Sequence, residues 1–257
     1  MTVDLNCDLG ESFGAYSIGE DEAVLPLISS ASIACGFHAG DPLVMDRTVE
    51  MAVKSGCVIG AHPGFPDLQG FGRRNMDVKG DELEAMLIYQ VGALDAFCRR
   101  HHTRLRYVKP HGALYNMCAA DEHLSRTLVH ALLSLPDAFP LMGMSQSWMT
   151  RAAEAAGLPV LHEVFADRAY HADGRLVSRR EPGSVLRDPE AIALRALRMV
   201  TEGVVDTLEG TKLHLKCDSI CIHGDSPAAL ESARAIRACL SRNGITVASP
   251  LKGEDMT

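Results

Sequence analysis

The chain has 257 residues, 47% of them hydrophobic, so it is long enough to fold around a substantial core. Its 33 acidic and 25 basic residues give a formal net charge of −8, which argues against nucleic acid and anionic membrane surfaces as partners. Its apolar runs are far shorter than the roughly 20 residues of a bilayer-spanning helix, so we expect no transmembrane segment.

The N-terminus and the cysteines indicate a reducing compartment. Asp4, Asp8 and Glu11 lie where a secretory signal would require an apolar segment, so we expect the protein to stay in the cytoplasm. The eight cysteines are scattered, and several lie inside apolar runs. We interpret them as reduced core residues, because even the closest pair, Cys217 and Cys221, is too weak a signal for a zinc site.

Short apolar runs, typical of buried parallel strands, alternate with helical segments along the whole chain. Asp81 with Glu84, and later Asp188 before Pro189, predict helix N-termini. A small hairpin is expected at 208–215. In chain order the other predicted elements are strands 3–7, 32–35 and 57–61, helix 81–98, strand 106–108, helix 121–135, strands 140–144 and 159–164, a helix beginning at 188, strand 220–222 and helix 226–244.

This alternation, without a linker, repeat or low-complexity tract, predicts a single α/β domain over residues 1–257. At least seven strands in a chain of this length favour a (β/α) TIM-like barrel with about seven strands. An open doubly wound sheet is the alternative. The sequence contains neither the G-x-G-x-x-G nor the P-loop motif, which argues against the common dinucleotide-binding and P-loop folds.

Polar residues recur where the predicted strands end, and this is where such folds collect their functional groups. Asp4, Asn6 and Asp8 alternate with apolar residues in the first strand, so they share one face, and Glu11 follows closely. Buried acids are costly unless they are paired or bind a metal. We expect a catalytic or ligand-binding role for these acids, with a buried ion-pair network as the structural alternative.

Four histidines occupy equivalent places. His38, His62, His111 and His223 each follow a predicted strand within a glycine-containing loop, and Lys109 stands just before one of them. A single histidine of this kind is most often structural. Their recurrence indicates a shared site.

Two further segments add polar groups. Glu163 and Asp167 end the sixth strand, and the long polar stretch 170–183 after them is interpreted as a lid or a subunit-contact loop. In the glycine-flanked loop 70–75, Arg73 is the better candidate for binding a substrate carboxylate through its fork of donors, and Arg74 is equally consistent with a solvated surface residue.

This set of side chains, without a nucleophilic serine in a G-x-S-x-G elbow, points to general acid/base or metal-assisted hydrolysis. A divalent metal could be held by Asp8 with two of the three nearest histidines, and Asp8, His38 and His62 are the set we prefer. A metal-free alternative uses an aspartate as the base and Lys109 or a histidine to stabilise an oxyanion.

Six motifs carry a family resemblance. They are Asp-Leu-Asn-Cys-Asp-Leu-Gly-Glu-Ser-Phe-Gly at 4–14, Ala-Cys-Gly-Phe-His-Ala-Gly-Asp-Pro at 34–42, Gly-Ala-His-Pro-Gly-Phe-Pro-Asp at 60–67, Gly-Phe-Gly-Arg-Arg at 70–74, Lys-Pro-His-Gly-Ala-Leu-Tyr-Asn at 109–116 and Ile-His-Gly-Asp at 222–225. In this order, and over essentially the whole chain, they resemble the LamB/YcsF family.

The resemblance implies a deformed (β/α) barrel related to polysaccharide-deacetylase and glycosidase-like barrels. It also implies one of the subunits of bacterial 5-oxoprolinase, a hydrolase of a cyclic amide. With ATP and magnesium, and together with two further subunits, that enzyme opens the lactam of 5-oxo-L-proline to L-glutamate. Because this chain has no common nucleotide motif, we expect the ATP step to belong mainly to another subunit. The sequence is also compatible with a homo-oligomer.

The site assignment follows from the strand ends and the motifs together. We expect catalytic roles for Asp8, His38, His62, Lys109 and His111, and substrate-binding roles for Asp4, Asn6, Glu11, Arg73, Tyr115, Glu163, Asp167 and His223. Two other functions stay open, a metal-dependent deacetylase of an N-acetyl sugar and a non-catalytic subunit that binds a small acid. The aromatic content of 5%, with Trp148 as the single tryptophan, argues against the sugar site.

Overall fold

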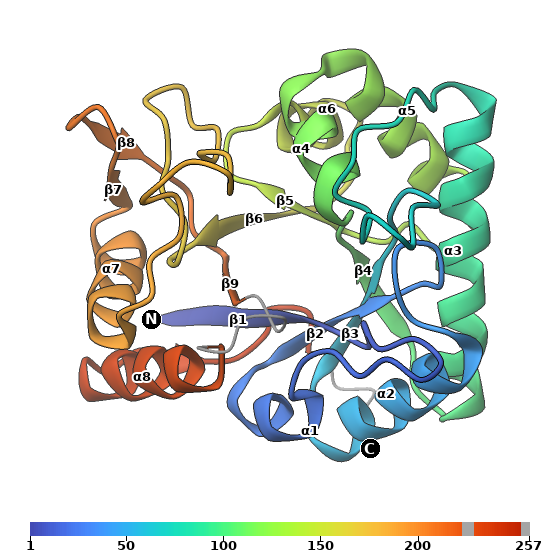
Figure 1. Cartoon of the computed structure of the whole chain (residues 1–257), viewed down its shortest axis with the longest axis horizontal. Helices are drawn as coiled ribbons and strands as arrows, with labels where there is room; N and C mark the ends of the chain where they lie inside the picture. Colours follow the sequence, from blue (N-terminus) through green and yellow to red (C-terminus); the bar gives the residue numbers. More distant parts are fainter. Residues whose placement is uncertain (223–228, 253–257) are drawn as a thin grey trace.

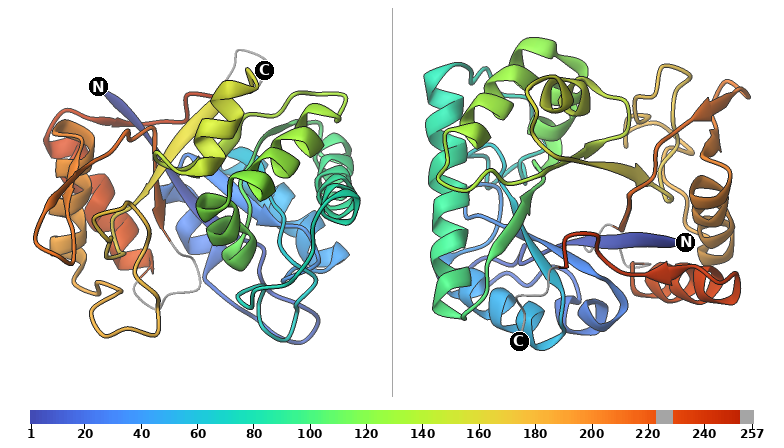
Figure 2. Two further views of the ribbon diagram at one scale, coloured as in Figure 1. Left: turned by 90° about the horizontal axis from the view of Figure 1, so that it is seen from above. Right: turned by 180° about the vertical axis from the view of Figure 1, so that it is seen from behind.

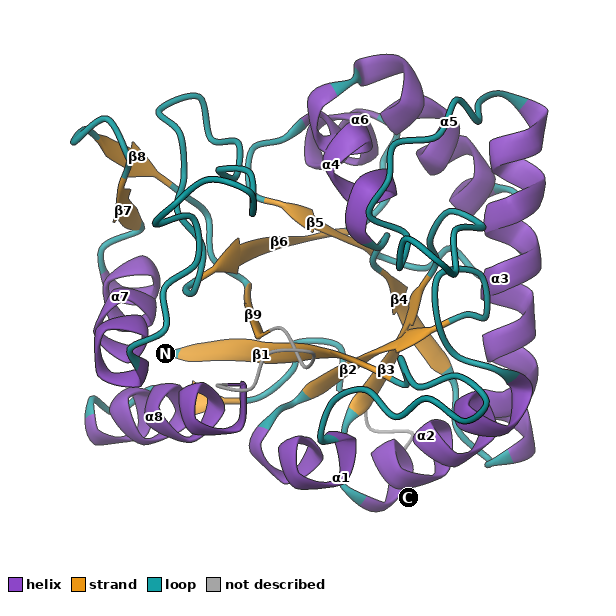
Figure 3. Ribbon diagram, in the orientation of Figure 1, coloured by secondary structure: helices purple, strands orange, loops and turns teal. Residues whose placement is uncertain are grey.

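The computed structural model describes residues 1–222 and 229–252, and its centre is a closed barrel of parallel strands (Figures 1 and 3). Neighbouring strands pair in chain order, and the first strand also pairs with the last one of the ring, which closes it. The predicted barrel is confirmed, and the open sheet is wrong. The seven barrel strands are β1 (Thr2–Leu9), β2 (Ser30–Ala34), β3 (Val58–His62), β4 (Leu105–Val108), β5 (Leu141–Met144), β6 (Val160–Phe165) and β9 (Ser219–Ile222).

Helices surround the barrel (Figure 1). Predicted helices 81–98 and 121–135 are α3 (Asp81–Arg100) and α5 (Glu122–Leu133), and the one beginning at 188 is α7 (Pro189–Thr201). Of predicted helix 226–244, residues 226–228 lie outside the described residues, and the described part is α8 (Ala229–Arg242), which packs beside α7 (Figure 2). No helix in the described ranges has both the length and the apolar content of a membrane span.

Several helices were not predicted. Asp41 and Pro42 are an ordinary start signal, since the Asp41 carboxylate accepts hydrogen bonds from the backbone N–H groups of Leu43 and Val44. The helix over Gly112–Ala120 is apolar on nearly every side, so its sequence has no hydrophobic periodicity to detect. The additional helices are α1 (Asp21–Val24), the 3₁₀ turn η1 (Leu25–Leu27), α2 (Pro42–Lys54), α4 (Gly112–Ala120) and α6 (Trp148–Ala155).

The helix starts predicted at 81, 121 and 188 are confirmed, the start at 226 lies outside the described residues, and one predicted cap is wrong. Asp121 and Asp188 cap α5 and α7 by accepting from backbone N–H groups. The capping pair of Asp81 and Glu84 is wrong, because Gly80, at φ 59°, holds the N-cap position and both acids lie inside the first turn. There they still favour the helix, through the positive end of its dipole.

The hairpin lies a few residues earlier than predicted. Its antiparallel strands are β7 (Val204–Asp206) and β8 (Lys212–His214), and Gly210, at φ 76°, falls in the turn between them. A short strand, β10 (Thr246–Val247), pairs with the beginning of β1 outside the ring. All eight cysteines are free, and seven of them are buried, as predicted for core thiols.

The bottom of the barrel interior is filled by a polar layer around Asp4. Its carboxylate accepts hydrogen bonds from the hydroxyls of Ser29 at 2.6 Å, Ser30 at 2.7 Å and Ser219 at 2.5 Å. Burial raises the pKa of Asp4 above the ordinary aspartate value, while these hydroxyls work in the opposite direction. Asp4 is therefore held within the interior by hydrogen bonds. This resembles the buried ion-pair network that was the alternative to a ligand-binding role, with hydroxyls in place of cations.

A glycine makes room for the largest interior side chain. Ser32, Gly60 and Tyr107 stand opposite one another on three adjacent strands. The fully buried ring of Tyr107 lies over Gly60, and its hydroxyl reaches the Ser32 hydroxyl at 2.9 Å. Without a glycine at position 60 this ring could not cross to its partner.

Replacing Gly60 by alanine should lower the free energy of unfolding by about 1–3 kcal/mol, because the new methyl group would overlap the Tyr107 ring in a packed interior. Denaturant unfolding measures this. The matched control is Gly92→Ala on α3, where the methyl group meets no atom and helix propensity predicts a gain of up to about 1 kcal/mol. Equal midpoints for wild type and Gly60→Ala would contradict this account of the packing.

Candidate active site at the barrel mouth

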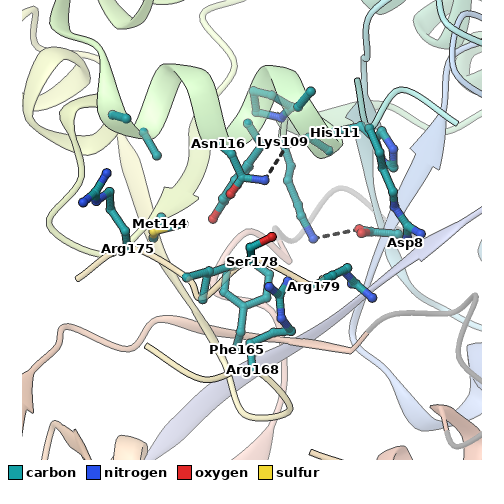
Figure 4. A pocket seen from close by; sticks show the side chains of 18 of the residues that line it. Asp8, Lys109, His111, Asn116, Met144, Phe165, Arg168, Arg175, Ser178 and Arg179 are labelled. Atoms are coloured by element: carbon teal, nitrogen blue, oxygen red, sulfur yellow. Dashed lines mark hydrogen bonds and ion pairs between the residues drawn. The ribbon is translucent and has the colours of Figure 1, made fainter. Parts of the chain in front are cut away.

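A buried lysine lies at the centre of the site. Lys109 follows β4 and is 2% exposed. Its Nζ donates to Asp8 Oδ1 at 2.7 Å and Asn6 Oδ1 at 2.9 Å, and lies 2.7 Å from Glu163 Oε1. Figure 4 shows the Asp8 contact at the mouth. An ammonium group has three N–H donors, so these three oxygens use its capacity.

The charge of Lys109 is stabilised by its neighbours. Burial works against the ammonium form, but the two carboxylates outweigh burial and hold the pKa of Lys109 well above the ordinary lysine value. The lysine is thus a permanent cation that fixes the orientation of Asp8. Because its donors are already engaged, its geometry suits this positioning role better than direct stabilisation of an oxyanion.

Two histidines face each other beside Asp8. His62 ends β3, and its Nδ1 lies 2.8 Å from the backbone oxygen of Lys109; His111 precedes α4, and its Nε2 lies 2.7 Å from the backbone oxygen of Phe71. Carbonyl oxygens only accept, so these ring nitrogens carry the hydrogens. When each ring carries one hydrogen, the remaining nitrogens, His62 Nε2 and His111 Nδ1, therefore direct lone pairs toward each other at 3.0 Å.

A third histidine and a glutamate complete this group. His38 stacks on His111 with ring centroids 3.7 Å apart, and its Nε2 lies 3.3 Å from Glu11 Oε1. Burial, reinforced by the other histidines, lowers the pKa of both His38 and His111 well below the ordinary value, so both rings are neutral at pH 7. Glu11, His38, His62 and His111 offer ligand atoms within 4.8 Å of one another.

Glycines bring the loops close enough to form this group. Gly72, at φ 63°, lies so near His38 and His111 that a side chain there would strike both. The loop is anchored because Arg74 pairs with Asp67. Arg74 stays largely solvated, as its surface alternative predicts, since its side chain is 64% exposed while it pairs with Asp67. Arg73 is the arginine of this pair that lines the cavity.

The structure brings most, though not all, of the predicted residues to one cavity of about 650 Å³. Asn6 and Glu163 lie beneath it, around Lys109, and His38 lies behind His111. Asp4 and Asp167 do not line it, and His223 lies outside the described residues. The predicted residues in its wall are Asp8, Glu11, His62, Arg73, Lys109, His111 and Tyr115.

Two groups of residues at this site were either given another role or missed. Glu11 was expected to bind substrate, yet it lies with the histidines, whereas Asp8, expected to join a metal, is engaged by Lys109 and lies 3.3 Å from His62 Nε2. The second group comes from the long loop between β6 and α7, whose arginines reach the cavity wall. Three arginines within 175–180 were a visible signal in the sequence.

Comparisons with known proteins agree with the motifs. The chain is 50% identical over 248 residues to a protein of Brevibacillus brevis that is named as one of the 5-oxoprolinase subunits, covering 96% of this chain and 98% of the relative. It superposes on a lactam utilization protein from Thermus thermophilus with a TM-score of 0.92 and 44% identity, covering 97% and 100% of the two chains.

A more distant likeness concerns the fold alone. A deacetylase solved with its substrate aligns with a TM-score of 0.53 at 14% identity, over 98% of this chain and 89% of that one. The predicted kinship with deacetylase-like barrels is thereby confirmed as architecture. The model of the LamB/YcsF family matches residues 3–255, and with the identities above this shows that the chain belongs to the LamB/YcsF family.

Proposed function

We propose that this chain is the lactam-opening component of an ATP-dependent 5-oxoprolinase, which converts 5-oxo-L-proline to L-glutamate. The observation that carries the proposal is the Asp8 and Lys109 pair beside the imidazoles of His62 and His111, all lining one cavity. The names of the two relatives, one for 5-oxoprolinase and one for lactam utilization, support the same substrate class.

The site can move the protons that lactam opening requires. His62 Nε2 has a lone pair to accept a proton from water, and Asp8 Oδ2 at 3.3 Å stabilises the resulting imidazolium. Lys109 fixes Asp8 in place by donating a hydrogen bond to its Oδ1. The same imidazole can return its proton to the lactam nitrogen when the C–N bond breaks.

The neighbouring donors fit a divalent metal. Ligand atoms about 2.0–2.1 Å from a tetrahedral zinc ion are about 3.4 Å apart. Here Glu11 Oε1 lies 3.3 Å from His38 Nε2 and 3.6 Å from His111 Nδ1, and His111 Nδ1 lies 3.0 Å from His62 Nε2. Neutral imidazoles with converging lone pairs are what a cation needs. Glu11, His38 and His111 would hold it, which leaves the lone pair of His62 Nε2 available for proton transfer, and the metal would supply Lewis-acid polarisation of the substrate carbonyl.

One other candidate function follows from this donor set and the barrel likeness, namely a metal-dependent deacetylase. Among the described residues, Tyr115 and Phe165 are the aromatic side chains that line the cavity. The Tyr115 hydroxyl is already bonded to Glu163 at 2.7 Å. This wall offers little for stacking a sugar. Release of acetate from N-acetylglucosamine oligomers, without glutamate from 5-oxoproline, would favour the deacetylase.

Replacing Asp8 by asparagine should reduce turnover at least about a hundredfold, because His62 would lose the charge that stabilises its protonated form. Glutamate formation by the reconstituted enzyme measures this. Asp46→Asn is the matched control, since Asp46 contacts His101 and Arg100 on the outer surface. Near-normal turnover in a folded Asp8→Asn protein would remove Asp8 from the mechanism.

The chain should take up one equivalent of Zn²⁺, measured by titration with the metal alone and by elemental analysis. His111→Ala should weaken this binding at least about tenfold through loss of one ligand. His130→Ala, at an exposed residue paired with Glu84, should bind like the wild type. Absence of stoichiometric Zn²⁺ binding, together with full activity after chelation, would contradict the proposed metal site.

The chain alone should produce no glutamate. A five-membered lactam is a nearly unstrained amide, so ATP must drive its opening, yet this sequence has no P-loop. Mixing the purified chain with 5-oxoproline, ATP and magnesium should therefore give glutamate only after two partner subunits are added. Robust turnover by the isolated chain would contradict the assignment of the ATP-dependent step to a partner subunit.

A further inference from the structure

One buried residue of α3 is polar. Five of the six buried residues of this helix are apolar, as its predicted apolar face requires, and the sixth is Gln90, which is fully buried. A glutamine on an apolar face costs free energy unless both ends of its amide find hydrogen-bond partners. Gln90 does not line the cavity, and the sequence did not mark it as part of the site. The partners of its amide therefore indicate its role.

The amide of Gln90 binds the backbone of the loop that follows β3. Its Oε1 accepts a hydrogen bond from Gly64 N at 2.9 Å, and its Nε2 donates to Gly64 O at 3.0 Å and to Met86 O at 3.1 Å. Both amide hydrogens are thus used. The preceding residue of the loop is held as well, since Pro63 O accepts from His111 N at 2.8 Å. The backbone at Gly64 is therefore fixed between α3 and the beginning of α4.

Gly64 lies against the ring of His38. A methyl group at position 64 would lie 2.6 Å from His38 Nδ1 and 3.0 Å from its Cγ, so a glycine is needed there for space. The same ring stacks on His111, with ring centroids 3.7 Å apart and an angle of 2° between the planes. The Gly64 backbone and the His111 ring together set the position of His38.

His38 depends on this packing because one of its ring nitrogens has no hydrogen bond. Its Nε2 lies 3.3 Å from Glu11 Oε1, whereas Nδ1 is buried and has no hydrogen-bond partner within residues 1–222 and 229–252. A histidine that binds a metal is usually oriented by a hydrogen bond from its second ring nitrogen. At His38 the close contact with Gly64 takes the place of that hydrogen bond.

We propose that Gln90 is a positioning residue of the active site, which acts through Gly64 to keep His38 Nε2 directed toward Glu11. This inference rests on the proposed function, in which His38 is one of the metal ligands. Helix α3 is a suitable support, because its apolar residues belong to the core and it packs against β3 and β4 (Figure 1). Side chains that act in a site are held most precisely from such rigid elements.

The first experiment titrates the isolated full chain with Zn²⁺ alone. Gln90→Met keeps the length of the side chain but removes the amide, so it should weaken Zn²⁺ binding at least about tenfold. Gly64→Ala should have a similar effect, because its methyl group would displace the His38 ring. Binding by folded Gln90→Met that equals the wild type would overturn the proposal.

The matched control is Ser125→Ala. Ser125 is fully buried, and its hydroxyl donates to Cys118 O at 2.5 Å, between α4 and α5. This variant also loses a buried hydrogen bond and should lose stability in denaturant unfolding, yet it should bind Zn²⁺ like the wild type. An equal loss of Zn²⁺ affinity in Ser125→Ala and Gln90→Met would mean that stability alone explains the effect, and would overturn the positioning role.

The second experiment follows the histidine ring nitrogens of the metal-free chain by NMR. Gln90→Met should shift the signals of His38, assigned by their loss in His38→Ala, and Ser125→Ala should leave them in place. Unchanged His38 signals in Gln90→Met would overturn the proposal even if stability falls. If the wild-type chain binds no Zn²⁺, the proposed metal site fails, and these signals alone decide whether Gln90 positions His38.

The third experiment measures glutamate formation by the reconstituted enzyme. Gln90→Met should lower turnover at least about tenfold and leave the KM for 5-oxoproline within about twofold of the wild type, because Gln90 does not line the cavity. A raised KM with normal turnover would overturn the positioning role. If the wild-type enzyme forms no glutamate, the proposed function fails, and the NMR signals still decide on Gln90.

Discussion

The burial of one lysine charge organises the barrel interior. Lys109 is taken out of water at the end of β4, and its ammonium group is stable there only because Asp8 and Glu163 each lie 2.7 Å away. Those carboxylates come from β1 and β6, so the charge ties together strands on different sides of the ring. Removing Lys109 would leave both carboxylates without their shared cation in a dry interior. The catalytic geometry and the integrity of the barrel therefore depend on the same contacts.

The site has two chemically distinct ends. Acids and neutral imidazoles gather where the strands end, and arginines gather on the loop that follows β6. The imidazole end offers uncharged rings at neutral pH, because burial lowers the pKa of both His38 and His111. The arginine end carries positive charge. A ligand with a reacting carbonyl at one end and a negative group at the other is oriented by this polarity before any chemistry starts.

The periodicity of the sequence predicts which side chains share a face of a strand, but not how deep in the barrel each side chain lies. Asp4, Asn6 and Asp8 do share one face of β1, as an alternation of two residues requires. Of these three residues only Asp8 lines the cavity. Each step of two residues toward the start of the strand places a side chain one layer deeper in the barrel. At the deepest layer Asp4 contacts serine hydroxyls instead of the cavity. The histidines His38, His62 and His111 were found because each stands at a strand end. Glu11 was placed with the substrate ligands, since nothing local shows that its loop folds over toward His38.

The closure of the ring has a consequence for how the protein is made. β1 carries Asn6 and Asp8, yet Asn6 is bonded to Ser219 on β9, more than two hundred residues later, and the first residues of β1 also pair with β10. β1 thus has partners that are synthesised more than two hundred residues after it. Its polar interior face stays incompletely paired until β9 has been synthesised, which makes barrel closure a slow, non-local step. A chain truncated before β9 would lack the strand that pairs with both β1 and β6 and so closes the ring around Lys109.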